Sequence, residues 1–361
     1  MNHDAVDYFR VDFTAEDSIV GGKHYPLGSF AAEMLAFEWN AAADIRRPLT
    51  QFREEFQIFL ASRSPSSAAA ALGAMQELWQ ALEKLPLYNK LLAGDRRRNA
   101  LIPYLRKHPD LTDDMLTPGT PRNEAYTRWM EKLETLESEL RAFVKDTEWM
   151  LEEFFQNLPS RRRQDYLRAY AGYRRTLEEA VRQQKDAEDA GDVWEDGTVD
   201  LDTVAFEYPV NISLVPVLDP QSRRLTMAEQ MTFESLPSFL YLDLYKGMAA
   251  GNLPQRCAHC RRWFLAAGGY HTLYCDRVVP GTGGKTCRKI GAHVREKEKQ
   301  RTETAAREYS RVYNRLKARK RRGRLDTDAW NRQVAQAQAL KDVFAAGAFT
   351  REEYVQKLNA L

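Results

Sequence analysis

All four cysteines of this 361-residue chain lie within one window of about thirty residues. Cys257 and Cys260 form a C-x2-C pair, and Cys275 and Cys287 follow as single residues. Such spacing is typical of structural zinc sites, because Zn²⁺ takes four thiolate ligands at tetrahedral corners. We therefore expect Cys257, Cys260, Cys275 and Cys287 to bind one structural Zn²⁺.

The residues around the cysteines predict the local fold of this site. Residues 262–265 and 270–274 favour β-structure and are separated by a glycine-containing turn, so we expect them to form a hairpin. Cys287 opens a long helical stretch, and the positive end of a helix favours a thiolate. A C-x2-C knuckle, a hairpin and a ligand in the first helical turn together predict a treble-clef finger.

Other interpretations of the cysteine-containing segment have less support in the sequence. Disulfides are typical of exported chains, but the N-terminal residues have neither a basic start nor an apolar core, so we expect a cytoplasmic protein. A redox C-x-x-C needs a thioredoxin-like βαβ context, which the sequence lacks. Residues 279–286 nearly spell a phosphate-binding loop, but Val279 replaces its first glycine.

The charge distribution is strongly asymmetric. The net charge is +2, yet residues 285–324 carry sixteen Lys and Arg against four Glu, or about +12, which leaves about −10 for the remainder. A basic segment beside a zinc finger predicts a polyanionic partner, DNA more than RNA, or else an acidic protein. The candidate nucleic-acid-binding residues are Arg288, Lys289, Arg295, Lys297, Lys299, Arg301, Lys317, Arg319, Lys320, Arg321 and Arg322.

The pattern of apolar residues predicts a mostly α fold with a small α+β part. The expected divisions are a helical N-terminal domain (1–185), an acidic linker (186–202), strands and a helix (203–250), the zinc finger (251–296) and a basic C-terminal helical hairpin (297–361). No apolar run is long enough for a membrane span, and we expect no membrane partner.

Individual elements can also be predicted. A strand is suggested near residues 8–13, and the prolines between 103 and 121 indicate a looser region between the helices 68–85 and 123–157. Further predicted elements are strands at 204–208, 211–218 and 225–233, with a turn at 219–222, and helices at 236–250 and from Cys287 to about Arg322. Asp326 or Thr327 and Thr350 are expected to cap two more helices.

Residues 240–299 resemble the treble-clef fingers of the CGNR type. The likeness rests on Leu242-Asp243-Leu244, the Cys257–Cys260 pair, Trp263-Phe264, Tyr274-Cys275 and Cys287-Arg288-Lys289, although Arg-Lys-Ile follows Cys287 in place of Gly-Asn-Arg. The chain is more similar to an uncharacterised bacterial family, a domain of unknown function, which has a similar approach to the last cysteine and a similar basic helical tail. The CGNR resemblance implies DNA binding by a transcription regulator.

Two functions follow from these observations. The first is a zinc-finger nucleic-acid-binding protein, a DNA-binding regulator, in which the helix after Cys287 presents its cations to phosphates. The alternative is a protein-interaction adaptor with a purely structural finger, favoured by Glu296, Glu298, Glu303 and Glu308 among the cations. We do not expect an enzyme, because the sequence shows no nucleophile–base motif and no open metal site.

Overall fold

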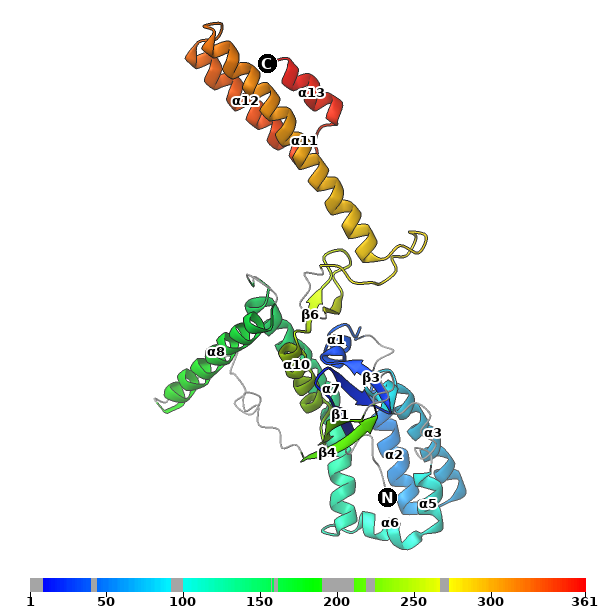
Figure 1. Cartoon of the computed structure of the whole chain (residues 1–361). Coiled ribbons are helices and arrows are strands. Elements are labelled where there is room, and N and C mark those ends of the chain that lie inside the picture. The colour runs from blue at the N-terminus through cyan, green and yellow to red at the C-terminus, as the bar shows by residue number, and fades with distance from the viewer. Residues whose placement is uncertain are drawn as a thin grey trace. The chain divides into compact units, whose positions relative to one another are not determined.

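The structure is a computed structural model that describes residues 9–39, 44–91, 100–156, 158, 162–189, 211–218, 225–266 and 273–361. Over these residues the chain is mostly α-helical with a small β part, as predicted (Figure 1). The chain divides into two units. Unit 1 comprises residues 1–256 and 261–272, and unit 2 comprises residues 257–260 and 273–361.

Unit 1 contains an antiparallel five-stranded sheet with the strand order β3-β2-β1-β5-β4. Its strands are β1 (Phe9–Phe13), β2 (Asp17–Val20), β3 (Lys23–Pro26), β4 (Asn211–Leu218) and β5 (Leu225–Phe233). The central strand β1 alternates buried and exposed residues, so Phe9, Val11 and Phe13 form one apolar face. The strands predicted at 8–13, 211–218 and 225–233 correspond to β1, β4 and β5.

The strands of this sheet come from both sides of the expected boundary between the N-terminal domain and the following strands. β1 pairs with β5 from Phe9↔Phe233 to Phe13↔Glu229, so strands from both sides of the acidic run belong to one sheet. A separate N-terminal helical domain was predicted because β1 is short, and its partner lies more than 200 residues away in the sequence. Of the predicted linker 186–202, residues 186–189 belong to helix α8 (Arg163–Asp189) and residues 190–202 lie outside the described residues.

Helix α10 (Leu236–Ala250) packs against the apolar side of this sheet. The ring of Phe239 lies 5.7 Å from Phe9, 5.4 Å from Phe233 and 5.3 Å from Phe30, which belongs to helix α1 (Ser29–Leu35). The close packing of α10 on the start of α1 requires a glycine, since a Cβ added at Gly247 would lie 2.8 Å from Gly28 Cα. Helix α10 has the predicted bounds.

The remaining helices of unit 1 extend its core. The region around the four prolines is more regular than predicted, because Pro103 lies in the first turn of α5 and Pro109 begins α6, where a missing N–H costs nothing. The bounds are α2 (Arg46–Ser62), α3 (Pro65–Leu82), α4 (Tyr88–Leu91), α5 (Leu101–Lys107), α6 (Pro109–Leu116), α7 (Pro121–Phe154) and α8 (Arg163–Asp189).

Unit 2 contains the helical tail that the sequence predicts: α11 (Cys287–Arg321), α12 (Thr327–Ala345) and α13 (Arg351–Asn359). Val312, Leu316, Phe344 and Tyr354 are among the residues of its separate core. Asp326 caps α12, and the capping box predicted at Thr350 is present. Figure 1 shows α12 and α13 lying along the second half of α11 only.

Two predicted β features lie outside the described residues, namely the strand at 204–208 and the turn at 219–222. Among the helices that the structure describes, none combines the length and the apolar character required to cross a bilayer.

Candidate metal centre

The first two cysteines lie in the connection between two short strands. β6 (Leu253–Arg256) and β7 (Trp263–Ala266) pair antiparallel, from Leu253↔Ala266 to Arg256↔Trp263. The predicted hairpin paired residues 262–265 with 270–274, but the partner of β7 is the strand that precedes Cys257. The sequence did not indicate β6, because Pro254 and Arg256 interrupt its apolar pattern. The pairing with 270–274 stays a prediction, since residues 267–272 lie outside the described range.

The β6–β7 hairpin is fixed to α7 by a small polar cluster. Arg256 pairs with Glu148 at 3.0 Å and with Glu152 at 2.8 Å. The guanidinium of Arg256 also lies 4.5 Å from the ring of Trp263, whose indole N–H donates to Glu148 at 2.7 Å. The stacking of Arg256 on Trp263, and the Glu148 carboxylate that both side chains share, hold β6 and β7 together next to the C-x2-C pair.

The other two cysteines flank a self-contained loop. Val278 and Thr286 form an isolated bridge, and the Val279 N–H donates to the Lys285 carbonyl at 2.9 Å. The Thr282 hydroxyl is engaged within this loop, where it lies 2.6 Å from the Val279 carbonyl oxygen. The loop therefore closes on itself and brings Cys287 back towards Cys275, which supports a spacer between ligands rather than a phosphate-binding loop.

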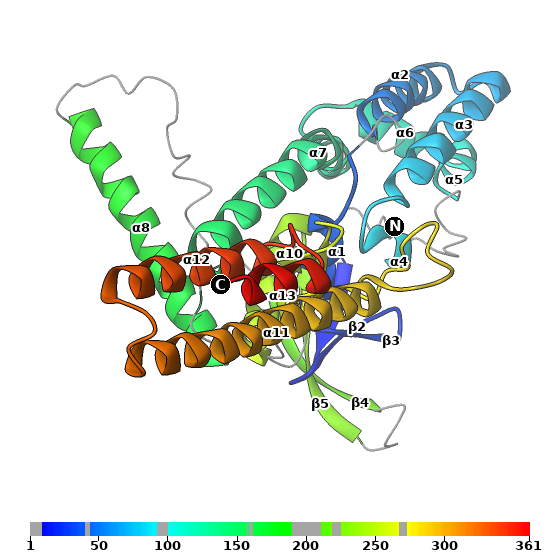
Figure 2. The same ribbon diagram turned by 90° about the horizontal axis from the view of Figure 1, so that it is seen from above.

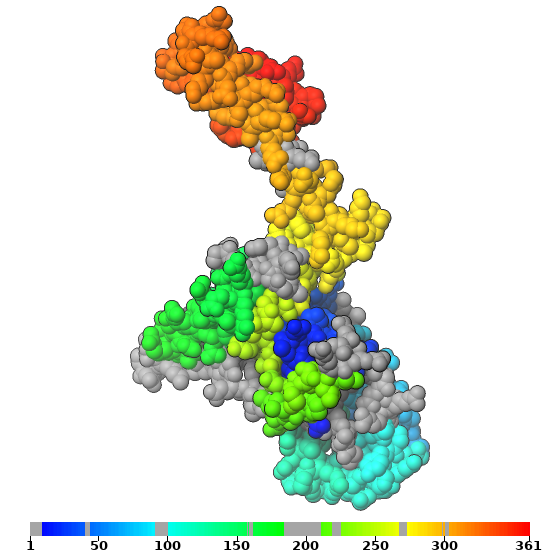
Figure 3. Space-filling model, viewed as in Figure 1, coloured from blue at the N-terminus to red at the C-terminus, as the bar shows by residue number. Residues whose placement is uncertain are grey.

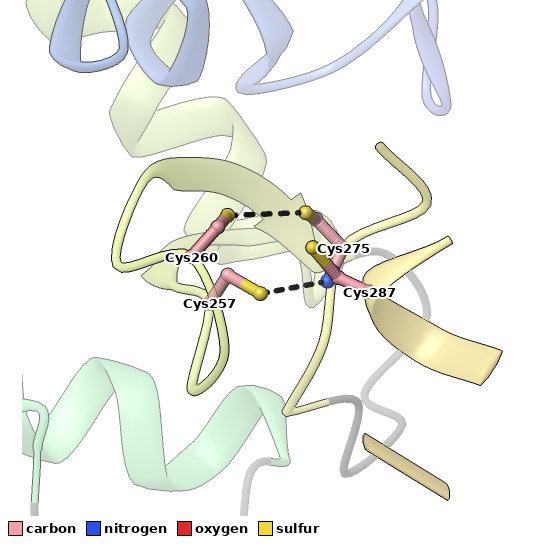
Figure 4. Close-up of side chains that lie close together, drawn as sticks. All are labelled: Cys257, Cys260, Cys275 and Cys287. Atoms are coloured by element: carbon pink, nitrogen blue, oxygen red, sulfur yellow. Dashed lines mark hydrogen bonds between the residues drawn. The ribbon is translucent and has the colours of Figure 1, made fainter. Parts of the chain in front are cut away.

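The four Sγ atoms converge on one point (Figure 4). All lie within 4.8 Å of one another, and Cys260 Sγ is 3.7 Å from Cys275 Sγ. A tetrahedron with metal–sulfur bonds of 2.3 Å has edges of about 3.8 Å, so one ion fits between these atoms. All four cysteines are free thiols. Four thiolate donors therefore make a coordination shell that could hold a metal ion.

The local structure stabilises thiolates unequally. Burial raises the pKa of Cys257, but N–H groups of Cys260, Cys275 and His259 outweigh it and lower that pKa to about 7. Burial and the neighbouring thiols raise the pKa of Cys287 to about 12. Burial also raises the pKa of Cys275. A cation among the four sulfurs would offset the repulsion between neighbouring thiolates and favour loss of the thiol protons. This is the usual coupling between metal binding and deprotonation.

A glycine lets the helix pack beside the cluster. Cys287 is the first residue of α11, after the N-cap Thr286, whose side chain accepts the N–H of Lys289. One turn later, a Cβ added at Gly291 would lie 2.3 Å from the ring of Tyr274, the residue before Cys275. Gly291 thus seats the first turn of α11 on the cysteine cluster, a role that no spacing rule in the sequence indicated.

The candidate cations of α11 fall into two groups. Arg288, Lys289, Arg295, Lys297 and Lys299 are exposed in the first half of the helix, while the Arg301 side chain lies outside the described residues. The spacing of Arg288, Arg295 and Lys299 places these three within about 40° of one another around the helix. Arg288 also pairs with Asp276 at 2.7 Å, and Lys299 lies 3.9 Å from Glu303.

The second half of α11 uses some of its cations within the tail. Arg319 donates to the Leu361 carbonyl oxygen at 3.0 Å, and Lys320 lies 5.5 Å from the ring of Trp330. Lys317, Arg321 and Arg322 are exposed. The candidate cations therefore do not form one uninterrupted face: five of those with described side chains are exposed in the first half of the helix and three, Lys317, Arg321 and Arg322, at its end.

Residues 205–360 match the model of a family described as a family of unknown function (DUF6076). The match includes β4, β5, α10, all four cysteines and almost the whole tail. It agrees with the expected likeness to an uncharacterised family, whereas the likeness to CGNR-type fingers is not shown. No curated protein and no solved structure matches the chain.

Proposed function

We propose that this protein is a zinc-dependent nucleic-acid-binding protein, in which the first half of α11 contacts DNA. The ion would be a structural Zn²⁺, held by Cys257, Cys260, Cys275 and Cys287, that stabilises the fold and takes no part in catalysis. A donor set of four thiols suits Zn²⁺, and four protein ligands leave no open position for a substrate. The proposed role of the metal is therefore structural, in support of a binding surface.

The observation that carries the proposal is the exposed first half of α11. Residues 292–297 are all exposed, so no described element of unit 2 covers any side of the helix there. In Figure 3 this part of α11 is a narrow column, which broadens where the tail helices pack. A bare helix is about 10–12 Å wide, which matches the width of the major groove of B-DNA.

The metal would set the rotation of this helix. Cys287 is both a cluster residue and the first helical residue, so the positions of Arg288, Arg295 and Lys299 relative to the cluster follow from helix geometry. Arginine and lysine on one face neutralise phosphates and release counterions from duplex DNA. Glu296 and Glu303 are also exposed here and would be repelled by phosphates, so they restrict which faces can bind.

The adaptor remains the second candidate, and one set of contacts favours it. Arg315 donates to the Leu358 carbonyl at 3.1 Å, and Arg319 donates to that of Leu361. Both cations thus stabilise the C-terminal end of α13, where helix carbonyls lack intrahelical partners. Part of the basic segment therefore has a structural use, which lowers the number of charges free for nucleic acid.

The test is a fluorescence anisotropy titration of zinc-loaded protein with duplex DNA and single-stranded RNA at several salt concentrations. The variant replaces Arg288, Arg295 and Lys299, which share one face of the helix, with alanine. Its matched control replaces the exposed Arg106, Lys107 and Arg128 of α5 and α7, which removes the same charge elsewhere. For every phosphate that the variant no longer neutralises, the slope of log affinity against log salt should fall by about 0.9 on B-DNA.

We expect the helix variant to lower affinity at least tenfold and to reduce the salt slope by roughly 2–3. The control should lower affinity uniformly by a small factor. Equal losses in both variants would mean that only net charge matters. If the wild type binds neither polymer at low salt, the nucleic-acid proposal fails and the adaptor takes its place.

A further inference from the structure

The β4–β5 hairpin carries a concentrated patch of exposed apolar side chains. Ile212, Leu214, Leu218, Leu225 and Met227 are 59–74 % exposed. The other exposed large apolar residues of the described chain are scattered, each on a different element, as on ordinary protein surfaces. Five on one hairpin therefore form a contiguous patch of the kind that marks an interaction site.

Strand register shows that the patch continues the core-facing side of the sheet. Directly paired residues of an antiparallel sheet share a face, and Leu218 pairs with Leu225, while Ile212 pairs with the buried Met231. β1 pairs only with residues 229–233 of β5, so the hairpin extends past the region that the core covers. Figure 2 shows the ends of β4 and β5 extending beyond the other strands.

The edge strand of the hairpin carries a proline but no charged residue as protection against association. β4 is an edge strand, and residues 211–218 contain no charged side chain. Pro216 removes one N–H donor from this strand, which weakens pairing along its free edge. The apolar face, rather than the edge, is therefore the surface available to a partner.

We propose that this face packs against the same face of a second copy of the chain. The patch is two strands wide, so a matching two-stranded ribbon covers it, whereas one extended peptide covers a single row. With about 160 Å² per leucine-sized residue of an extended chain, the five residues expose about 500 Å². Two copies would bury about 1,000 Å², the lower limit for a specific interface, so we expect a reversible dimer whose population depends on concentration.

Sedimentation velocity of the zinc-loaded full chain from about 2 to 200 µM tests this inference. The 41.6 kDa monomer should shift to twice that mass as concentration rises. Met227 lies in the middle of the patch, because it follows Leu225 on the same face of β5 and pairs with Pro216, which lies between Leu214 and Leu218 on β4. Met227→Lys should therefore raise the dissociation constant at least tenfold. The control is Ile58→Lys, an exposed apolar residue of α2 that should leave dimerisation unchanged.

A charge-swap experiment separates loss of the interface from loss of the fold. Met227→Lys and Met227→Glu should each be monomeric, but an equimolar mixture should form a heterodimer, because the two side chains meet near the twofold axis. A misfolded variant could not show this rescue. A chain that stays monomeric at 200 µM, a dimer insensitive to Met227→Lys, or a mixture without rescue would overturn the proposal. A monomer would leave the face to a strand from a different protein.

Discussion

Replacing Asp243 with alanine should destabilise unit 1 more than any single surface change. Asp243 is completely buried in α10, and its carboxylate accepts the N–H groups of Gly28, Phe30 and Ala31 at 2.9–3.0 Å. It therefore caps α1 from another helix, and α1 has no side-chain cap of its own. The sequence drew attention to Asp243 only through a family resemblance, without indicating this role.

The magnitude follows from the three donors. Each buried N–H left without a partner costs about 1–3 kcal/mol, and water entering the space of the missing carboxylate recovers part of this. We expect Asp243→Ala to lower the free energy of unfolding by about 3–5 kcal/mol, a large share of the ~5–15 kcal/mol typical of a domain. Asp12→Ala in the same sheet, which removes one partly buried bond from Gln230, should cost about 1 kcal/mol.

Urea unfolding followed by circular dichroism compares the two variants. If the loss of unfolding free energy in Asp243→Ala lies within about 1 kcal/mol of that in Asp12→Ala, the three hydrogen bonds do not hold α1.

The dependence of stability on pH gives a second test of Asp243. Burial raises the pKa of Asp243 to about 7, although the three N–H groups oppose this. The raised pKa adds stability at low pH that is lost as pH rises through about 7, and Asp243→Asn should abolish this dependence.

Three further outcomes are expected. Gly247→Ala should lower the melting temperature, because its Cβ would lie 2.8 Å from Gly28 Cα, whereas Gly73→Ala, with open space around it in α3, should raise it slightly. Limited proteolysis should cut first within the acidic run 186–202, since charged, glycine-containing connections are the usual sites, and first cuts elsewhere would refute its assignment as a connection. Tyr354→Phe should destabilise the tail by about 1 kcal/mol in thermal unfolding, because its hydroxyl donates to the buried Ala305 carbonyl at 3.0 Å.

Local signals in the sequence were sufficient for many elements. The bounds of β4, β5 and α10 were predicted correctly, and so were the cap of α12 and the capping box at Thr350, because alternation, helical periodicity and caps depend on neighbours in the chain. The convergence of the four cysteines was predictable for the same reason. Their clustering in one short window, with the spacing of zinc ligands, is what predicted that the sulfurs meet.

Contacts between distant segments were not predictable. Nothing in Phe9–Phe13 indicates that its partner is β5, and nothing in Asp243 indicates three donors more than 210 residues away. β6 was missed because Pro254 breaks the apolar alternation, although it supplies the strand that pairs with β7. Charge counts likewise could not distinguish the exposed Lys297 from Arg319, which holds the end of the chain.

The two ends of α11 should depend differently on the metal. The second half is held by the tail core, whereas residues 292–297 are exposed on all sides and gain only weak support from pairs such as Lys299 with Glu303, worth about 0.3–0.5 kcal/mol. Because helix nucleation is unfavourable, the cluster at Cys287 must supply much of the stability of the first half.

Removing the metal with a chelator should therefore speed amide hydrogen exchange in residues 287–303 and leave exchange in residues 305–358 unchanged. If exchange speeds up equally in both halves, α11 unfolds as one unit. If the first half stays protected from exchange, the metal does not support the helix.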